Sequence, residues 1–288
     1  MMKKILFCLF ALGLATTISS CEKKDNTEFV VEGTVEMPEQ SYIYIEEVLE
    51  ESTQVIDSVK PNGKSFVFTL KPSEKAFYRL NIFGKQQAFI VGGPGEVLKV
   101  EVGGNAKDAK FKMSGTKDAD LLYKAFLIAE SLRKSEKELS GKYRDAQEQG
   151  NPQLAQEIVD DFDEILEAKL LECKSLIKEA DNSLVALSIA SNFFNTNEHF
   201  EFLDSLAAKF EKEQPESRYS KQFISMVKSA KALGIGSKAP DFQLATLDGK
   251  WLKLSEVKGK AIVIDFWASW CRPCRQENPF MVALYERY

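Results

Sequence analysis

The 288-residue sequence contains a single histidine, His199, and only five cysteines. One histidine excludes a cluster of histidine metal ligands, and five cysteines are too few for a disulfide scaffold in a chain of this length. There is no excess of positive charge either, because 38 Lys and Arg face 43 Asp and Glu, which gives a net charge of −5. This balance argues against a dedicated nucleic-acid-binding protein, which needs a basic face. With 44% hydrophobic and 28% charged residues, the chain is also not mostly disordered or collagen-like.

The N-terminal segment has the pattern of an export signal. Two lysines precede an apolar run over residues 5–15, and small polar residues follow up to Cys21. The run is too short to span a bilayer as a helix, so residues 1–20 are predicted to be a secretory signal peptide. Residues 18–21 (Ile-Ser-Ser-Cys) resemble a bacterial lipobox. We therefore expect a lipid anchor on Cys21 and a tether over residues 21–27, in the bacterial cell envelope and facing the periplasm. An ordinary cleaved signal with a coincidental cysteine is the alternative.

Residues 28–115 are predicted to form an N-terminal antiparallel β-rich domain, a sandwich or barrel-like sheet of about seven short strands. Asn62-Gly63 is a hairpin turn signal, since both residue types tolerate positive φ. The acidic pairs Glu46-Glu47 and Glu50-Glu51 are interpreted as a solvated strand edge and a loop rather than a metal site. Segments with strand propensity are residues 29–35, 42–45, 65–70, 77–83, 87–91 and 97–102.

Residues 116–233 are predicted to be helical. Asn151-Pro152 is a good helix start, with an N-cap residue followed by proline at the first helical position. One apolar seam at helical spacing includes Cys173, which is therefore interpreted as a buried core thiol rather than a catalytic one. His199 has no identifiable Cys or acid partner and is expected at the surface or at a helix end. Further helices are expected over residues 183–194 and 217–232.

The pattern changes again after the Gly234–Ser237 break, so residues 234–288 are expected to form a third region. A turn at Asp248-Gly249 precedes a short predicted strand over residues 252–254. Residues 261–267 (AIVIDFW) are almost continuously apolar, which is typical of a central parallel strand covered on both faces. A helix is expected directly after this strand, over residues 273–288.

Two cysteines with the spacing of a redox pair lie between that strand and that helix, in Trp270-Cys271-Arg272-Pro273-Cys274. This spacing on a helical turn brings two sulfurs within disulfide range. Cys271 would lie at the helix N-terminus, where free backbone N–H groups and the macrodipole favour a thiolate, and Arg272 adds positive charge. We therefore expect a low pKa for the Cys271 thiol, with Cys271 as attacking nucleophile and Cys274 as resolving thiol.

Half of a zinc site has the same CxxC spacing. Here the second half is missing, since no other CxxC and no suitable histidine follow Cys274, and we expect no metal. A purely structural disulfide is the other alternative in an exported chain. The position of the CxxC motif between a predicted strand and a predicted helix favours redox chemistry over both a zinc site and a purely structural disulfide.

Three stretches together resemble the TlpA/ResA-like thiol–disulfide oxidoreductases, a thioredoxin-fold family related to the AhpC/TSA redoxins. They are Gly236–Phe242 (GSKAPDF), Asp248–Lys250 (DGK) and Phe266–Cys274 (FWASWCRPC). The resemblance implies an α+β multidomain chain whose C-terminal region is a partial thioredoxin-like α/β domain. It also implies an enzyme without a cofactor, acting on thiols or disulfides of exported proteins. A membrane or periplasmic thiol would serve as electron donor.

The resemblance also assigns roles beyond the two cysteines. Asp265 matches the buried acid that handles the proton of the resolving thiol, and a carboxyl within an apolar strand has a raised pKa suited to accepting a proton. A strand-end aspartate open to water is the alternative. Glu277 matches an acidic residue near the active site, and Pro279 matches the proline that kinks the active-site helix. Trp270, Arg272 and Pro273 complete the motif as supporting residues.

Two alternatives accompany this interpretation. Peroxiredoxins share the Ala239–Phe242 opening, but they use a Thr-x-x-Cys nucleophile, and the threonine is absent before Cys271. A thioredoxin-like domain also needs about 100–150 residues, more than residues 236–288 supply, so the sequence is expected to be truncated within this domain. The competing function is an anchored binding or structural lipoprotein that carries an inactive redoxin segment.

Overall fold

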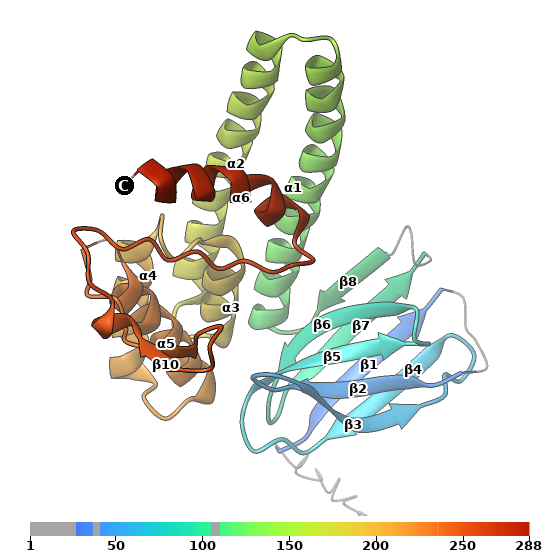
Figure 1. Cartoon of the computed structure of the whole chain (residues 1–288). Coiled ribbons are helices and arrows are strands. Elements are labelled where there is room, and N and C mark those ends of the chain that lie inside the picture. The colour runs from blue at the N-terminus through green and yellow to red at the C-terminus, as the bar shows by residue number, and fades with distance from the viewer. Residues whose placement is uncertain (1–26, 37–40, 105–109, 235, 288) are drawn as a thin grey trace, which may run out of the picture. The chain divides into compact units, whose positions relative to one another are not determined.

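The computed structural model describes residues 27–36, 41–104, 110–234 and 236–287. The chain divides into two compact units, Met1–Lys228 and Ser229–Tyr288. The first unit contains two β-sheets followed by a series of helices, which makes the protein mixed α/β (Figure 1). The predicted signal peptide, the predicted lipid site Cys21 and residues 21–26 of the tether lie outside the described residues.

Two four-stranded sheets build the β-rich part of the first unit. Their inward-facing apolar side chains form a common core that includes Phe29, Phe68 and Leu80. Alternate residues of the first strand are buried, as the alternating sequence predicts. The first sheet has the order β4 (Ser65–Leu70), β1 (Phe29–Val35), β7 (Val97–Gly103), β8 (Lys110–Ser114). The second has the order β3 (Thr53–Val59), β2 (Ile43–Val48), β5 (Ala76–Ile82), β6 (Gln86–Gly92).

This sandwich differs from the predicted antiparallel one in its pairing and its strands. β1 pairs with β7 in parallel, with Val31 opposite Leu98. Strands β3 and β8 are additional to the expected segments. β3 is exposed along nearly its whole length, so its sequence lacks the alternation that reveals a half-buried strand. The predicted turn forms, with Gly63 at φ 60°, but it leads from a strand of one sheet to a strand of the other.

The acidic pair in β2 is not the solvated strand edge that the sequence suggests. Glu46 is only 5% exposed, and the register of β2 against β3 shifts between Ile45 and Glu46. The Arg79 guanidinium donates to Glu46 Oε2 through Nε at 2.7 Å and also through Nη2. Burial alone raises the pKa of Glu46, but hydrogen bonds from Arg79 and Asn81 and the charge of Arg79 outweigh it, so the pKa lies below its ordinary value.

The helical region confirms the predicted helix starts. Asn151 caps α2 (Pro152–Ala180) by accepting from the Leu154 N–H, and Pro152 is its first residue. Cys173 on this helix is fully buried in the helical core, as predicted, and burial raises the pKa of its thiol to about 12. The other helices are α1 (Lys117–Glu148), which forms a long antiparallel hairpin with α2 (Figure 1), α3 (Leu184–Phe193), α4 (Phe200–Glu213) and α5 (Arg218–Leu233).

Side chains at the start of α5 join this helix to the second sheet. The Tyr219 hydroxyl accepts a hydrogen bond from the Phe77 N–H at 3.0 Å, and its ring meets the Phe77 ring edge-on. Arg218 forms ion pairs with Glu47 and Glu74. His199 lies at the N-terminal end of α4 with its ring edge-on to Phe194, so the expected helix-end position is confirmed.

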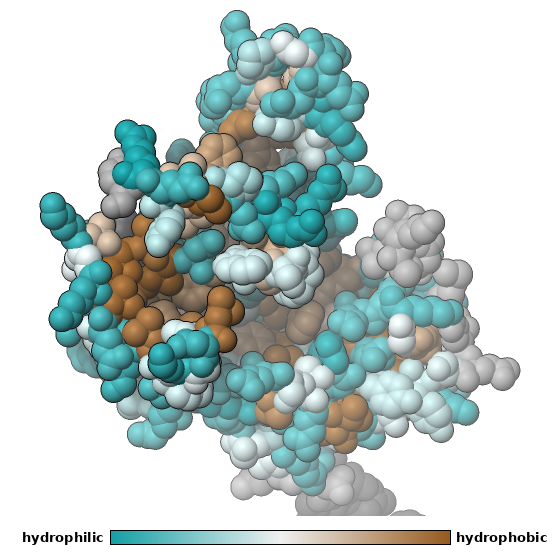
Figure 2. Space-filling model, in the orientation of Figure 1, coloured by the Kyte–Doolittle hydropathy of each residue, from teal (hydrophilic) through white to brown (hydrophobic). Residues whose placement is uncertain are grey.

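The second unit contains a short hairpin of β9 (Gln243–Ala245) and β10 (Trp251–Lys253), a 3₁₀ turn η1 (Leu254–Glu256), and helix α6 (Arg272–Arg287). Gly249 adopts φ 78° in the turn between the strands, where Asp248-Gly249 predicts it. None of the described residues of this unit is buried. Figure 2 shows hydrophobic residues on the surface of this unit.

The predicted central strand over residues 261–267 is absent, and this segment forms neither a helix nor a strand. Its side chains are open to solvent, with Val263 64% and Phe266 84% exposed. A strand requires partners for its backbone N–H and C=O groups. Among the described residues of this unit, β9 and β10 are the only strands, and they pair with each other.

Candidate redox site

Cys271 occupies the N-cap position of α6. Its carbonyl accepts the first intrahelical hydrogen bond, from the Arg275 N–H at 3.2 Å, while its own N–H donates to the Ala268 carbonyl at 3.0 Å. The first N–H groups of a helix have no intrahelical acceptor. Together with the positive end of the helix macrodipole, they favour negative charge at this position.

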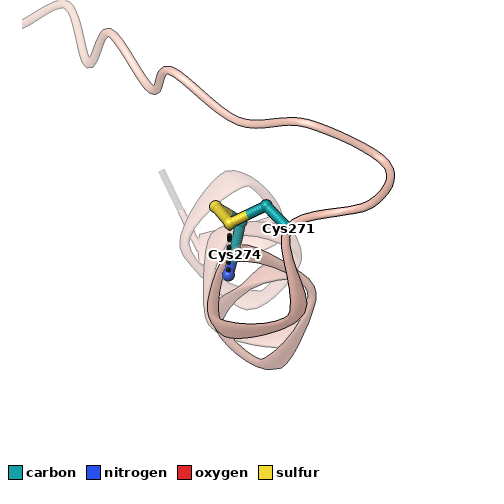
Figure 3. The surroundings of a disulfide bond; sticks show 2 residues. All are labelled: Cys271 and Cys274. Atoms are coloured by element: carbon teal, nitrogen blue, oxygen red, sulfur yellow. Dashed lines mark hydrogen bonds between the residues drawn. A yellow bond between two sulfur atoms is a disulfide. The ribbon is translucent and has the colours of Figure 1, made fainter. Parts of the chain in front are cut away.

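A disulfide joins Cys271 and Cys274 (Figure 3), whose Cα atoms are 5.4 Å apart. Within the first turn of the helix, the Cys274 N–H donates to the Cys271 Sγ at 3.3 Å. Both cysteines are half-buried, so a reagent can reach the sulfurs without unfolding of the helix. Such an N–H donor favours a thiolate, so we expect it to stabilise a Cys271 thiolate when the disulfide is reduced.

The supporting residues of the motif lie around this turn. Trp270 is 86% exposed, and Arg272 and Pro273 are also exposed. Pro273 occupies the second helical position, where its missing N–H costs no intrahelical hydrogen bond. The ring therefore stiffens the segment between the two sulfurs and leaves the helix start intact.

The two predicted acids are not part of this arrangement. Asp265 is exposed on the segment that forms no strand. The prediction that its carboxyl is buried is therefore wrong, because the strand that would bury it does not form. Glu277 is exposed on α6, and among the described residues no contact joins either carboxylate to the sulfurs. Pro279 lies inside α6, as predicted.

One further residue near the disulfide, Arg275, was not predicted from the sequence. It is exposed on α6 and follows Cys274 directly. Residues four apart on a helix lie on the same face, so Arg275 shares a face with Cys271, whereas the adjacent Arg272 does not. The i to i+4 spacing within Cys271–Arg275 is the signal that could have identified it.

Among the described residues, no group of three or more His, Cys, Asp or Glu side chains could hold a metal ion. In the same residues no helix combines the length and apolar character needed to cross a membrane.

A disulfide within one turn at a helix N-terminus, preceded by an exposed tryptophan, is the arrangement expected of a thioredoxin-like dithiol site. The AhpC/TSA family matches residues 235–288. "Thioredoxin-like protein YneN" of Bacillus subtilis (strain 168) is 50% identical over 62 residues, which are 21% of this chain and 36% of that protein. No solved structure matches the chain.

Two proteins named "Thiol-disulfide oxidoreductase ResA" are also similar. The one from Bacillus thuringiensis (strain Al Hakam) is 44% identical over 54 residues, 19% of this chain and 31% of that protein. The one from Geobacillus thermodenitrificans (strain NG80-2) is 44% identical over 57 residues, 20% of this chain and 33% of that protein. The chain thus spans about a third of the length of these curated relatives. Within that stretch, the predicted resemblance to TlpA/ResA-like thioredoxin-fold proteins is confirmed.

Proposed function

We propose that the protein is a thiol–disulfide oxidoreductase of the bacterial cell envelope that works through the Cys271–Cys274 dithiol. The observation that carries this proposal is the disulfide in the first turn of α6, with the Cys274 N–H donating to the Cys271 Sγ. The similarity to ResA proteins over the same residues supports it. The clients would be exported proteins with thiols or disulfides.

The exchange needs only the two sulfurs. In the reduced protein, the Cys271 thiolate attacks one sulfur of a client disulfide, and the client S–S bond breaks with its electron pair on the leaving sulfur, which takes up a proton. The Cys274 thiol then loses its proton and attacks Cys271 Sγ in the mixed disulfide. This second step releases the client as a dithiol and leaves the Cys271–Cys274 disulfide. A membrane or periplasmic dithiol reduces that disulfide by the same steps in reverse.

Trapping of mixed disulfides tests this order of attack. In the full chain with Cys274→Ser, the resolving step is lost, so Cys271 should accumulate adducts with exported proteins. These adducts should separate on non-reducing gels and disappear with dithiothreitol. The matched control is Cys271→Ser, which keeps one thiol in the same turn but removes the proposed nucleophile. Equal trapping by both variants, or no adducts with Cys274→Ser, would count against the proposal.

The envelope location rests on the lipobox-like residues 18–21. We propose that residues 1–20 are cleaved and that Cys21 carries the lipid, with the dithiol facing the periplasm. Fractionation of cells that express the full chain with Cys21→Ser tests this. The variant should leave the membrane fraction and should no longer incorporate a labelled fatty acid. A variant that stays membrane-bound contradicts the lipid anchor.

A second candidate function is a non-catalytic binding or structural lipoprotein with an inactive redoxin segment. The lack of any buried residue among the described residues of the second unit favours it, because a catalytic thioredoxin-like site is ordinarily held by a packed scaffold. Reduction of insulin by dithiothreitol separates the two functions. An oxidoreductase accelerates the reaction in a manner that Cys271→Ser abolishes, whereas a binding protein leaves the rate unchanged.

A further inference from the structure

The face of α6 that carries Cys271 also carries a cation that the proposed mechanism does not use. Arg275 is the fourth residue after Cys271, and its N–H donates to the Cys271 carbonyl, which fixes the two residues on successive turns of one helix face. Cβ atoms at this spacing lie about 5–6 Å apart. Helical side chains also lean toward the helix N-terminus, a direction that favours an approach of the Arg275 side chain to the turn that holds the two sulfurs.

This cation has no anionic partner within the described residues. Of the four arginines in the first unit, Arg79, Arg133 and Arg218 form ion pairs with carboxylates, whereas Arg144 forms none with a described residue. Neither Arg272 nor Arg275 forms an ion pair with a described residue, and the first turn of α6 contains no acidic residue. The exposed end of α6 is therefore locally positive, although the chain as a whole has a net charge of −5.

We propose that Arg275 selects clients whose reacting cysteine is flanked by acidic residues, an inference that rests on the proposed oxidoreductase function. A client sulfur must approach Cys271 Sγ on the face that Arg275 shares. An aspartate or glutamate one or two residues from the client cysteine then comes near the guanidinium, which lacks a competing carboxylate. The net negative charge of the chain otherwise repels acidic clients. The local positive charge of Arg275 therefore changes the exchange rate of acidic clients more than that of neutral ones.

Exchange with three matched disulfide peptides tests the proposal. The peptides share one sequence and differ only in the two residues beside the disulfide, which are aspartates, glutamines or lysines. The second-order rate constant for oxidation of the reduced full chain is measured with each peptide at low and high salt. We expect the aspartate peptide to react about tenfold faster than the lysine peptide at low ionic strength, and salt to shrink this ratio.

Three variants assign the effect to Arg275. Arg275→Gln should reduce the aspartate-to-lysine rate ratio severalfold. Arg272→Gln removes the same charge from the same turn but from another face, so it should reduce the ratio less. Arg287→Gln removes a charge from the far end of α6, about 18 Å from Arg275 along the helix. This distance exceeds the Debye length of about 10 Å at 0.1 M salt, so at that salt concentration the variant should leave the ratio unchanged.

The glutamine peptide separates a failure of the client selection by Arg275 from a failure of the oxidoreductase function. If it reacts but the unmodified chain shows no preference for aspartate, or if Arg275→Gln and Arg272→Gln lower the ratio equally, the assignment to Arg275 is wrong while the oxidoreductase function stands. If none of the peptides oxidises the reduced dithiol, the oxidoreductase function fails, and the selection by Arg275 fails with it.

Discussion

Glu46 and Cys173 are buried ionisable side chains whose surroundings shift their pKa values in opposite directions. The carboxylate of Glu46 has Arg79 as a charged partner, which lowers its pKa despite burial. The Cys173 thiol lies in an apolar helical core, and burial raises its pKa to about 12. A charged partner therefore keeps the buried group ionised in the first case, and its absence keeps the second group neutral at ordinary pH.

The contrast between Cys173 and Cys271 predicts selective labelling. In the reduced full chain, iodoacetamide should modify Cys271 with a pH midpoint below the value of about 8.5 of a free cysteine, because the N-terminal end of α6 favours its thiolate. Cys173 should remain unmodified until denaturant is added, since it is fully buried. Peptide mass spectrometry measures both sites. A Cys271 profile centred on the free-cysteine value would contradict the electrostatic account.

The Glu46–Arg79 pair predicts a pH-dependent loss of stability. Arg79→Met leaves the Glu46 carboxylate buried without its partner, and we expect a loss of about 3 kcal/mol in the free energy of unfolding at pH 7. Because the folded pKa of Glu46 is depressed, the stabilisation is present above the unfolded pKa of 4.5 and is lost as pH falls through the folded pKa. The difference between the two proteins in urea titrations should therefore shrink at acidic pH.

Arg133→Met is the control for this prediction. It removes an exposed ion pair with Glu130 on α1, and such pairs contribute less than about 1 kcal/mol. If both variants lose the same stability, or if the Arg79→Met difference stays constant with pH, the buried pair does not act as described.

At the scale of elements, α5 is attached to the second sheet by a few polar contacts at its first turn. The Tyr219 hydroxyl is the acceptor for the Phe77 N–H at the start of β5. Tyr219→Phe removes that acceptor and leaves the half-buried N–H unpaired, at an expected cost of about 1–2 kcal/mol in the free energy of unfolding. Tyr143→Phe, which removes an exposed hydroxyl on α1, should cost less than about 0.5 kcal/mol. Thermal unfolding of both variants measures the difference.

Elements that depend on local sequence were predictable, and those that depend on distant partners were not. The start of α2 follows from Asn151 and Pro152 alone, because capping involves neighbouring residues. The burial of Glu46 depends on Arg79, which lies on another strand, and sequence spacing gives no sign of that contact. The apolar run over residues 261–267 satisfies the composition of a buried strand, but a strand also needs neighbours that supply hydrogen bonds.

The same distinction applies to the candidate site. The Cys271–Cys274 pair and its position at a helix N-terminus are local features, so the sequence predicted both. The proposed burial of Asp265 required a folded strand and failed without one. Arg275 could have been identified from its spacing to Cys271. The sequence instead indicated Arg272 as the positive charge near Cys271, because Arg272 lies between the two cysteines.

At the scale of the whole molecule, the two units differ in how well their backbones are protected. Strands β1 and β5 each pair on both sides, whereas residues 262–267 have no backbone hydrogen bonds to other described residues. Amide hydrogen exchange of the full chain should therefore be slow in β1 and β5 and close to the unstructured rate over residues 262–267. Mass spectrometry of peptic fragments resolves these segments. Slow exchange over residues 262–267 would show that the segment is paired in solution.

The parallel pairing of β1 with β7 constrains the order of folding. β1 lies inside its sheet, between β4 and β7, so this first strand of the described residues cannot pair along both edges until Val97–Gly103 has been synthesised. Pairings between strands this far apart in sequence close a long loop and form slowly. Until then, the edge of β1 that pairs with β7 is open to pairing with other chains. Newly made protein is thus most vulnerable to aggregation before β7 has emerged.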